Sequence, residues 1–528
     1  MPTTVLKKNE ARVPFLGEKL SYIRGLDPLG LQITSEATYS WLLPGITNLT
    51  NHIRYYGFYC WLLDVYERDG GSTDATEQYN FIRRAELMIA LLIQLKSPKT
   101  LAIPGSTYAA HMIKDVAGTF DLKVGADLRQ GANDETYWKI RTGAFGQYYA
   151  GALRLLGLVT SIAQSETVFK RTETTENHIS GQALAGAFAE QVPPQMQQLF
   201  IGNVRSGRLR AVDVDSLYRY FNLAAIADDS NEQAMYLQLL TSQDHPLREE
   251  EVPARHRAAT LQKLLAFLHQ NERTGWLAFL LENYADYGSK GSSTLMGWYY
   301  YQLNEYWQFA CGAILAAVLM ELDKQGGSAD LADFLADFKA RMGQQLSRLD
   351  RAIDPDLALG HVLDDAAGTL ETEEVYVHAI EQGVKDRKPV VVAVHGLLLI
   401  MQLYKHNAPQ LAALEEFGTR PELYRDGNFW KYAKVLQTRR EMPLTDFIGD
   451  FLHRQILSRH EYVAIRKLGN GLQSTLKFAI EDGFIQLLEN ILPMFSGPRL
   501  NVLLNMSREL HLVDGEGQLT PKGLSIIS

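Results

Sequence analysis

Apolar residues recur at helical spacing through most of the chain, and strand-like alternation is confined to short stretches. Stripes at steps of three and four residues predict long amphipathic helices, and the regions between them are short and polar. The predicted helices cover 79–95, 217–227, 258–269, 275–284, 296–322, 331–349, 390–404 and 499–510. The pattern therefore predicts a mainly α, multi-domain protein, with Arg83 and Arg84 on the polar side of its helix 79–95.

One stretch, 143–192, combines helical and strand-like patterns. An apolar helical stripe runs to Leu156, and Gly157 stands where a glycine ends a helix. Strand-like residues follow at 158–159 and 167–169, and a small-residue helix begins after Gly181. This order resembles the last helix, wing and trailing helix of winged-helix domains. The resemblance implies a small module of helices and one β-hairpin.

The same order returns near the C-terminus. Residues 474–488 alternate as a hairpin with Glu-Asp-Gly at its turn, and an amphipathic helix follows over 499–510. The end of the chain, LHLVDGEGQLTPKGLSII, then repeats helix, strand, turn and strand. A Leu-Val pair enters the hairpin in both places, and Gly523 follows the second strand as Gly181 does. The sequence therefore predicts two winged-helix-like modules.

The N-terminal region is unusually aromatic. A helix capped within Thr47 to Thr50 is predicted to run through HIRYYGFYCWLLDVYER, interrupted only by Gly57. Because this helix is apolar around most of its circumference, we expect it to be packed on several sides or to offer a partner surface. A core helix is favoured, because aromatic stripes at helical spacing usually belong to the core. The string WLLPGITNLTNHIRYYGFYCWLL is similar to uncharacterised bacterial proteins of mobile elements and antiviral defence.

Turn-rich residues 69–74 and Pro193-Pro194 mark candidate boundaries. They predict an aromatic helical segment over 1–74 and a winged-helix-like domain over 75–194. A helical middle domain over 195–430 and a basic, winged-helix-like domain over 431–528 complete the expected organisation.

Charge restricts where nucleic acid could bind. The 528 residues carry a formal net charge of −9, so any such binding requires a local basic patch. Residues 420–477 hold 11 Lys and Arg against 6 Asp and Glu. The candidate phosphate contacts are Lys170, Arg171, Arg205, Arg208, Arg210, Arg439, Arg440, Arg459, Arg466 and Lys467, with duplex DNA as the expected ligand. Alternatively, the C-terminal cations pair with the acidic residues just upstream.

Cys60 and Cys311 lie among apolar or aromatic residues, which is typical of buried thiols in a reducing cytoplasm. No apolar leader is visible near the N-terminus. The most apolar window, 389–404, is shorter than a membrane-spanning helix and carries His395 and Gln402, so we expect a core helix and no membrane.

Catalytic and metal-binding motifs are not evident. The loop 288–294 has phosphate-loop residue types in the wrong order, and no nucleophile elbow occurs. Glu374 and His378 share one helix face but have no third ligand in view. We therefore expect no metal and no cofactor, and a non-enzymatic protein is favoured.

One pattern supports an alternative. Arg454 and His460 resemble the spaced Arg and His of HEPN-type ribonucleases. That resemblance implies RNA cleavage by a dimer, in which His460 would move a proton and Arg454 would hold the developing phosphorane charge.

The layout of a winged module near each end, with helices between, resembles the kleisin-type subunits that bridge SMC ATPases. The leading hypothesis is therefore a non-enzymatic DNA-binding or scaffold subunit of a bacterial multi-protein complex. A role in defence against phage or plasmids is the expected setting, with an SMC-like ATPase or a nuclease as partner.

Overall fold

The computed structural model describes residues 21–22, 27–115, 118–129, 135–163, 165–173, 179–241, 253–271, 275–286, 292–349, 353–365, 370–468 and 473–527. Contacts divide the chain into two compact units. Unit 1 comprises the described residues of Met1–Thr38 and Asn283–Ser496, and unit 2 those of Tyr39–Glu282 and Gly497–Ser528. The predicted boundaries at residues 74 and 194 fall inside the Tyr39–Glu282 segment of unit 2, and the one at residue 430 falls inside the Asn283–Ser496 segment of unit 1.

The described protein is mainly helical, as predicted, with small sheets. Two of the three boundaries between the units fall within α1 (Gln32–Leu42) and α12 (Trp276–Asp286), and the third lies between Ser496 and Gly497. The other elements of unit 1 are β1 (Ser21–Tyr22), α13 (Ser293–Lys324), β6 (Ser328–Asp330), α14 (Leu331–Leu349), α15 (Leu359–Asp365), α16 (Glu373–Lys385), α17 (Pro389–Asn407), η4 (Ala408–Gln410), α18 (Leu411–Gly418), α19 (Phe429–Thr438), α20 (Leu444–Asp450), η5 (Phe451–Ser458), α21 (Arg459–Lys467), β7 (Gln473–Ser474), β8 (Phe478–Glu481) and β9 (Phe484–Leu487).

Unit 2 is built from helices that are all shorter than the 32-residue α13 and from three pairs of short extended segments. Its other elements are α2 (Arg54–Arg68), α3 (Ala75–Lys96), α4 (Ser106–Asp115), β2 (Thr119–Asp121), α5 (Leu122–Ala126), η1 (Phe145–Tyr149), α6 (Ala150–Leu155), β3 (Val159–Ile162), β4 (Ser165–Arg171), α7 (Gly181–Glu190), α8 (Pro194–Ser206), β5 (Arg208–Arg210), η2 (Ala211–Asp213), α9 (Val214–Phe221), α10 (Asn231–Thr241), α11 (Pro253–Gln270), α22 (Leu500–Glu509) and α23 (Pro521–Ile527). β2 pairs antiparallel with β5, β3 with β4, and Val513 with Leu519.

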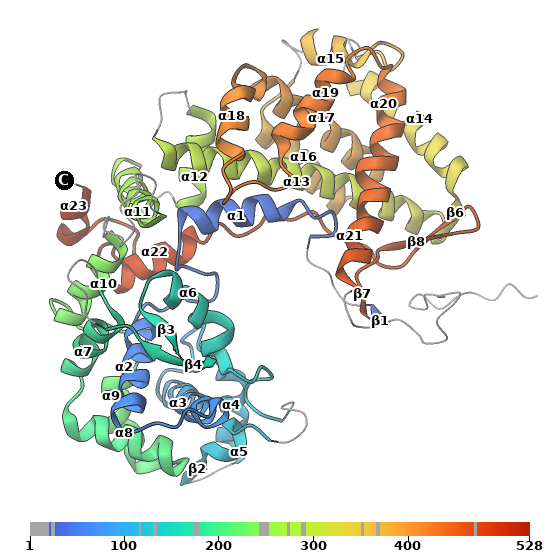
Figure 1. Ribbon diagram of the computed structural model, residues 1–528. Coiled ribbons are helices and arrows are strands. Elements are labelled where there is room, and N and C mark those ends of the chain that lie inside the picture. The colour runs from blue at the N-terminus through green and yellow to red at the C-terminus, as the bar shows by residue number, and fades with distance from the viewer. Residues whose placement is uncertain are drawn as a thin grey trace, which may run out of the picture. The chain divides into compact units, whose positions relative to one another are not determined.

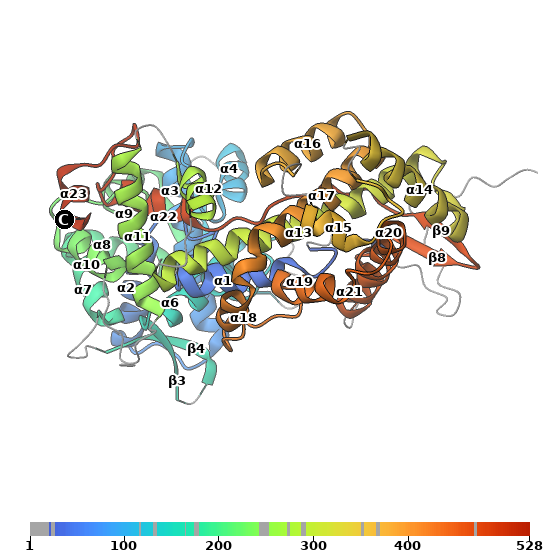
Figure 2. The ribbon, with the colours of Figure 1, turned by 90° about the horizontal axis from the view of Figure 1, so that it is seen from above.

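The core of unit 1 forms around α13, a 32-residue helix that is buried along nearly its whole length. α17 packs along α13, and both α14 and α16 pack against α17 (Figure 1, Figure 2). A helix without a polar face has to be covered on every side. The helices of unit 1 supply that cover.

Buried polar residues on α13 hold in place, by hydrogen bonds, the chain segments that cross this helix. Glu305 accepts hydrogen bonds from the backbone N–H of Ser496 at 2.5 Å and from its hydroxyl at 2.8 Å. Asn304 accepts from the N–H of Phe429 at 2.9 Å, and Gln308 donates to the carbonyl of Met494 at 2.7 Å. Because buried polar groups require partners, these bonds determine where the segments lie.

The most apolar window belongs to α17. The helical stretch Pro389–Gly418 is the one helix in the described part of the chain that is long and apolar enough to span a membrane. Within its apolar window, 67% of the residues are buried against other helices of the protein. This burial agrees with the prediction of a core helix.

The predicted hairpin over 474–488 forms in unit 1. β8 and β9 pair antiparallel, and Asp482 and Gly483 both have positive φ, 51° and 80°. Such angles at both central positions match the twist of a two-residue hairpin. β6 adds a third strand along β9. This strand is not predicted from the sequence, because three residues carry too little alternation.

The aromatic helix α2 is the core of unit 2. All of its residues from Arg54 to Leu63 are buried, so the prediction of a core helix is confirmed. Trp61 contacts Phe188 and Phe200, with ring centroids 5.4 Å and 5.8 Å apart. Gly57 does not interrupt the helix. A Cβ there would lie 2.2 Å from the Tyr236 hydroxyl, so the glycine allows the tyrosine to approach.

The start of α2 is stabilised by a residue from the far end of the chain. Glu509 accepts a hydrogen bond from the N–H of Ile53 at 3.1 Å and one from Nδ1 of His52 at 2.5 Å. Thr47 and Thr50 instead bond to each other. The predicted local cap is therefore wrong, because a carboxylate from α22 occupies the helix N-terminus.

Arg83 and Glu86, one turn apart on α3, organise the chain that leads into the first module. The fully buried Arg83 donates to the carbonyl of Ala126 at 2.5 Å and that of Trp138 at 2.9 Å. Glu86 accepts from the N–H of Phe145 at 2.6 Å, and its burial raises its pKa. The prediction that Arg83 lies on a polar face is wrong, since loop carbonyls surround it.

The first predicted module has the expected order of helix, hairpin and helix. α6 ends at Gly157, whose φ is 70°, and the N–H of Leu158 donates back to the carbonyl of Leu153 at 2.9 Å. After the hairpin, the Thr172 hydroxyl donates to the carbonyl of Gly157 at 2.7 Å and accepts from the N–H of Gly181 at 2.8 Å. Thr172 thereby joins the end of α6 to the start of α7.

The C-terminal module repeats these bonds. α22 ends at His511, whose φ is 58°, and the N–H of Leu512 donates to the carbonyl of Ser507 at 2.8 Å. The Thr520 hydroxyl donates to the carbonyl of His511 at 2.5 Å and accepts from the N–H of Gly523 at 3.1 Å. The wing is shorter here, with a single bridge between its strands. We call each arrangement a Thr–Gly clasp, formed by Thr172 and Gly181 or by Thr520 and Gly523.

The two glycines have the same steric role. A Cβ on Gly181 would lie 2.0 Å from the Leu158 carbonyl oxygen, and a Cβ on Gly523 would lie 2.1 Å from that of Leu512. No side chain fits at either position without movement of the backbone. The sequence correspondence between Gly181 and Gly523 is therefore confirmed at the level of atoms, and unit 2 contains both copies.

We predict opposite effects for two glycines of α7. Gly181→Ala is expected to lower the free energy of unfolding by about 1–3 kcal/mol, because the new methyl group collides with the Leu158 carbonyl. Gly186→Ala, with nothing within 4 Å, is expected to raise it by about 0.5–1 kcal/mol. Urea denaturation measures both. Equal effects of the two substitutions would contradict the role assigned to the clasp.

Candidate functional site

The first wing offers little free positive charge. Arg171 is buried on β4 and forms ion pairs with Asp64 and Glu67, each at 3.0 Å. Lys170 is partly exposed, and it has no ion pair among the described residues. A phosphate could therefore reach Lys170 directly. To reach Arg171 it would have to break the ion pairs with Asp64 and Glu67.

The cations after the first wing are also mostly paired. Arg205 contacts Asp69 at 2.5 Å, and Arg210 forms two hydrogen bonds with Asp213 at 2.8 and 2.9 Å. Arg208 on β5 is exposed, and within the described chain it has no ion pair. These predicted residues do not form one basic surface.

Two cations of the C-terminal series are neutralised within unit 1. Arg439 pairs with Asp450, and Arg440 pairs with Asp364. Asp364 belongs to the acidic residues upstream, so for Arg440 the alternative of internal pairing is what the structure has. Neither residue lies with the remaining members of the series.

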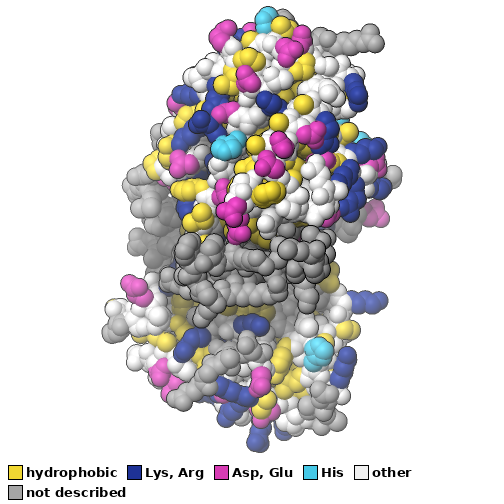
Figure 3. Space-filling view, turned by 90° about the vertical axis from the view of Figure 1, so that its right-hand side faces the viewer, with side chains coloured by type: hydrophobic (Ala, Val, Ile, Leu, Met, Phe, Trp, Pro, Cys, Tyr) yellow, Lys and Arg dark blue, Asp and Glu magenta, His cyan; other side chains and the backbone are white. Residues whose placement is uncertain are grey.

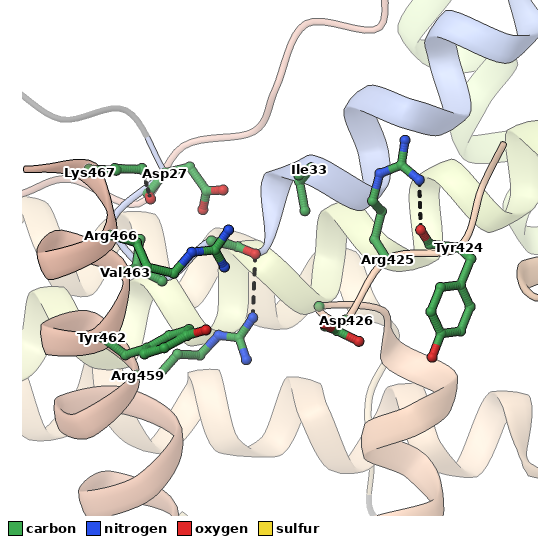
Figure 4. A pocket seen from close by; sticks show the side chains of 12 residues that line it. Asp27, Ile33, Tyr424, Arg425, Asp426, Arg459, Tyr462, Val463, Arg466 and Lys467 are labelled. Carbon is green, nitrogen blue, oxygen red and sulfur yellow. Dashed lines mark hydrogen bonds between the residues drawn. The ribbon is translucent and has the colours of Figure 1, made fainter. Parts of the chain in front are cut away.

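The structure brings Arg459, Arg466 and Lys467 together. With Arg425 they line one cavity of about 420 Å³ in unit 1 (Figure 4). The cavity lies between α21, the loop over residues 424–427 and the start of α1. Figure 4 shows Arg459 and Arg466 extending from α21 toward the space that Ile33 faces from α1. We call this cavity the basic pocket.

The local geometry of α21 follows from its sequence. Arg459, Tyr462, Val463, Arg466 and Lys467 are spaced three, four, seven and eight residues from the first, so they share one helix face. All five line the basic pocket. This face of α21 therefore becomes a wall of the cavity.

Arg459 reaches from α21 to the opposite wall of the basic pocket, where it hydrogen-bonds to the backbone, and part of its guanidinium remains available as a donor. Its Nε donates to the carbonyl of Leu29 at 2.6 Å, and Nη2 donates to that of Gly30 at 3.3 Å. Gly427 lies close to both groups: a Cβ there would be 3.0 Å from the Gly30 oxygen and 3.3 Å from Nη2. The missing side chain leaves room for the guanidinium, whose Nη1 makes no hydrogen bond to the described residues.

Both carboxylates in the basic pocket are already engaged. Asp27 accepts hydrogen bonds from the N–H groups of Leu31 at 2.8 Å and Gln32 at 3.1 Å, which caps α1. Asp426 pairs with Lys431 at 2.9 Å, and this bond lowers the pKa of Asp426. Four cations thus face two carboxylates that have other partners, so the cavity attracts anions.

Two tyrosines flank the basic pocket and remain exposed. Tyr462 is 61% exposed, with the Arg466 guanidinium 5.5 Å from its ring centroid. Tyr424 is 44% exposed, and the Lys431 ammonium lies 4.0 Å from its ring centroid. Aromatic rings beside arginines are typical of sites that bind nucleotides or single strands.

One face of the molecule shows both signs of charge side by side. On the face drawn in Figure 3, Lys and Arg side chains are interspersed with Asp and Glu over much of the area that the structure describes. Interspersed charges give a weak field at a distance. The basic pocket is therefore distinguished by the convergence of its cations.

The structure separates the two residues of the ribonuclease hypothesis. Arg454 is 69% exposed and pairs with Asp450 at 2.6 Å. His460 is completely buried, its Nδ1–H donates to the carbonyl of Pro28 at 2.9 Å, and its Nε2 accepts from the N–H of Lys477 at 2.9 Å. Burial lowers the pKa of His460 to about 4. A histidine with both nitrogens engaged is not placed to exchange a proton with a substrate.

Sequence reasoning missed several residues of the site. Arg425 counted toward the local charge, but nothing marked it as a contact, and Asp27, Tyr424 and Tyr462 were not singled out. The signal for Tyr462 was present, since it stands one turn from both Arg459 and Arg466 on a helix. No sequence signal places Asp27 beside α21, because more than 400 residues separate them.

Groups of residues that could hold a metal ion were a further candidate feature. Among the described residues, no group of three or more His, Cys, Asp or Glu could hold one. Glu374 instead accepts a hydrogen bond from the Tyr306 hydroxyl at 2.6 Å. The pair of Glu374 and His378 gains no third ligand in the part of the chain that the structure describes.

Comparisons give no relative to guide the assignment. No protein-family model, no curated protein and no solved structure matches the chain. The functional conclusion therefore depends on the geometry of the site.

We predict that His460 makes unit 1 sensitive to acid. Since its pKa falls from 6.5 to about 4 on folding, the unfolded chain binds the proton more tightly, and stability is lost as pH falls below 6.5. The loss attributable to this group between pH 7.5 and 5 is about 2 kcal/mol. Urea denaturation of the wild type and of His460→Asn at both pH values measures it. An equal pH dependence in the two proteins would contradict the prediction.

Proposed function

We propose that this chain is a non-enzymatic nucleic-acid-binding subunit that holds phosphate groups in the basic pocket. The observation that carries the proposal is the convergence of Arg425, Arg459, Arg466 and Lys467 on one cavity. Arg466 supports it most directly: it is exposed, and among the described residues its guanidinium contacts the Tyr462 ring and forms no ion pair. Arginine donors without a fixed acceptor are suited to phosphate.

The wider setting remains part of the proposal. The chain would act in the cytoplasm within a bacterial multi-protein complex for defence against phage or plasmids, with an SMC-like ATPase or a nuclease as partner. The similarity of the 41–63 string and the two winged-helix-like modules support this setting. Both cysteines are buried and unpaired, which suits a reducing compartment. Since α2 is buried in unit 2, other surfaces would contact the partner.

The proposal is tested by removing two cations of the basic pocket, Arg425 and Arg466, that form no ion pair among the described residues. Arg425→Ala and Arg466→Ala are combined in the full chain, and binding of labelled duplex and single-stranded DNA is followed by fluorescence anisotropy over a range of salt. Each lost phosphate contact removes about one unit from the slope of log affinity against log salt. We expect the slope to fall by about two and the affinity to fall at least about tenfold.

The matched control is Arg454→Gln, which removes an exposed cation of unit 1 that does not line the basic pocket. Its slope and affinity are expected to stay at the wild-type values. An unchanged slope in the double variant, or an equal loss in the control, would refute a role for the basic pocket.

A further inference from the structure

We infer that the basic pocket takes a single phosphorylated nucleoside unit, and therefore that the chain binds single strands in preference to duplex. This inference rests on the proposed function and replaces duplex DNA with a narrower ligand. It follows from the size of the cavity, its free donors, its exposed rings and the position of its carboxylates.

The size of the cavity limits the ligand. A volume of about 420 Å³ falls at the small end of ordinary ligand sites. A hollow of this size admits one nucleotide, whereas a duplex presents phosphates on a convex rod with its bases paired inside. A base can enter such a hollow only when it is unpaired.

The donors for the phosphate lie on both walls of the basic pocket. Arg466 has no hydrogen bond to the described residues, so its guanidinium is available to an incoming oxygen. Arg425 uses one nitrogen, Nη1, to reach the carbonyl of Tyr424 at 2.6 Å. Arg459 uses Nε and Nη2. Paired arginines with remaining N–H groups hold phosphate in a fixed geometry.

The exposed rings and one apolar side chain provide surfaces for a base. Tyr462 lies on the same helix face as Arg459 and Arg466, and Ile33, 46% exposed, faces the cavity from α1 (Figure 4). A base that stacks on Tyr462 keeps its own phosphate within reach of the neighbouring arginines. Stacking is tolerant of sequence, so we expect little preference among bases.

The carboxylates favour a nucleoside over a purely anionic ligand. The Asp426 side chain is 92% exposed at the edge of the basic pocket, and its bond to Lys431 uses one of its two oxygens, Oδ1. The other oxygen would repel the carboxylates of an acidic peptide. A nucleotide has amino and hydroxyl groups that can donate to it as well as a phosphate for the arginines.

The experiment separates stacking from charge. Tyr462→Leu removes the ring and keeps an apolar side chain, and Tyr462→Phe is the matched control that keeps the ring. Affinities of the full-length proteins for a labelled single strand and for the matching duplex are measured by fluorescence anisotropy. We expect the wild type to bind the single strand more tightly. Tyr462→Leu should weaken that binding about 5- to 100-fold, as expected for one stacked base.

Tyr462→Phe should retain single-strand affinity, and neither substitution should change duplex affinity. A competition experiment then shows which nucleotide of the strand occupies the basic pocket. If the pocket holds the terminal nucleotide, adenosine monophosphate should displace the strand. If it holds an internal nucleotide, only another oligonucleotide should displace the strand. Displacement by a polyglutamate peptide to the same extent would overturn the inference in favour of an acidic protein ligand.

The outcomes distinguish this inference from the proposed function. If Arg466→Ala weakens single strand and duplex equally and Tyr462→Leu changes neither, nucleic-acid binding stands and the single-strand inference is wrong. If the wild type binds no nucleic acid, both are wrong.

Discussion

Burial of two helices, α2 and α13, along nearly all of their length is the constraint on which the rest of the structure depends. The buried part of each helix has no polar face, so other parts of the chain must enclose it on every side to remove its apolar surface from water. Flanking sequence alone does not enclose them. Unit 1 therefore draws in the segment up to Thr38, and unit 2 draws in the segment from Gly497. The discontinuity of both units follows from this need, which boundaries based on local turns could not reveal.

The sequence predicted those parts of the fold that depend on local periodicity. The helices α11, α13, α14 and α17 lie close to their predicted ranges, because apolar stripes encode them directly. The repeat of a hairpin followed by a glycine could also be predicted from the sequence. The residues that contact each other across long stretches of sequence could not. Arg83 appeared to belong to a polar face because nothing nearby indicates the loop carbonyls that surround it, and the cap of α2 comes from Glu509.

The candidate site could be predicted only in part, for a related reason. Counting charges found the basic segment that contains Arg459 and Arg466, but a count does not distinguish a free cation from a paired one. Arg439 has the same charge and the same sequence neighbourhood, yet Asp450 neutralises it. His460 shows the same limit for chemistry, since its spacing from Arg454 is suggestive while its burial gives it a structural role. At a site that binds anions, the cations that can act are those whose N–H groups are not already hydrogen-bonded within the protein.

The C-terminal module has a consequence for synthesis of the chain. During translation α2 emerges early, but the carboxylate that caps it and the second Thr–Gly clasp belong to residues 497–527, which are made more than 400 residues later. Unit 1 has all of its segments once residue 496 has left the ribosome, whereas unit 2 is still incomplete. The long first segment of unit 2, residues 39–282, is thus made before the long segment of unit 1, residues 283–496, yet unit 2 is completed later. Until then its aromatic core lacks the contacts of the 497–527 segment.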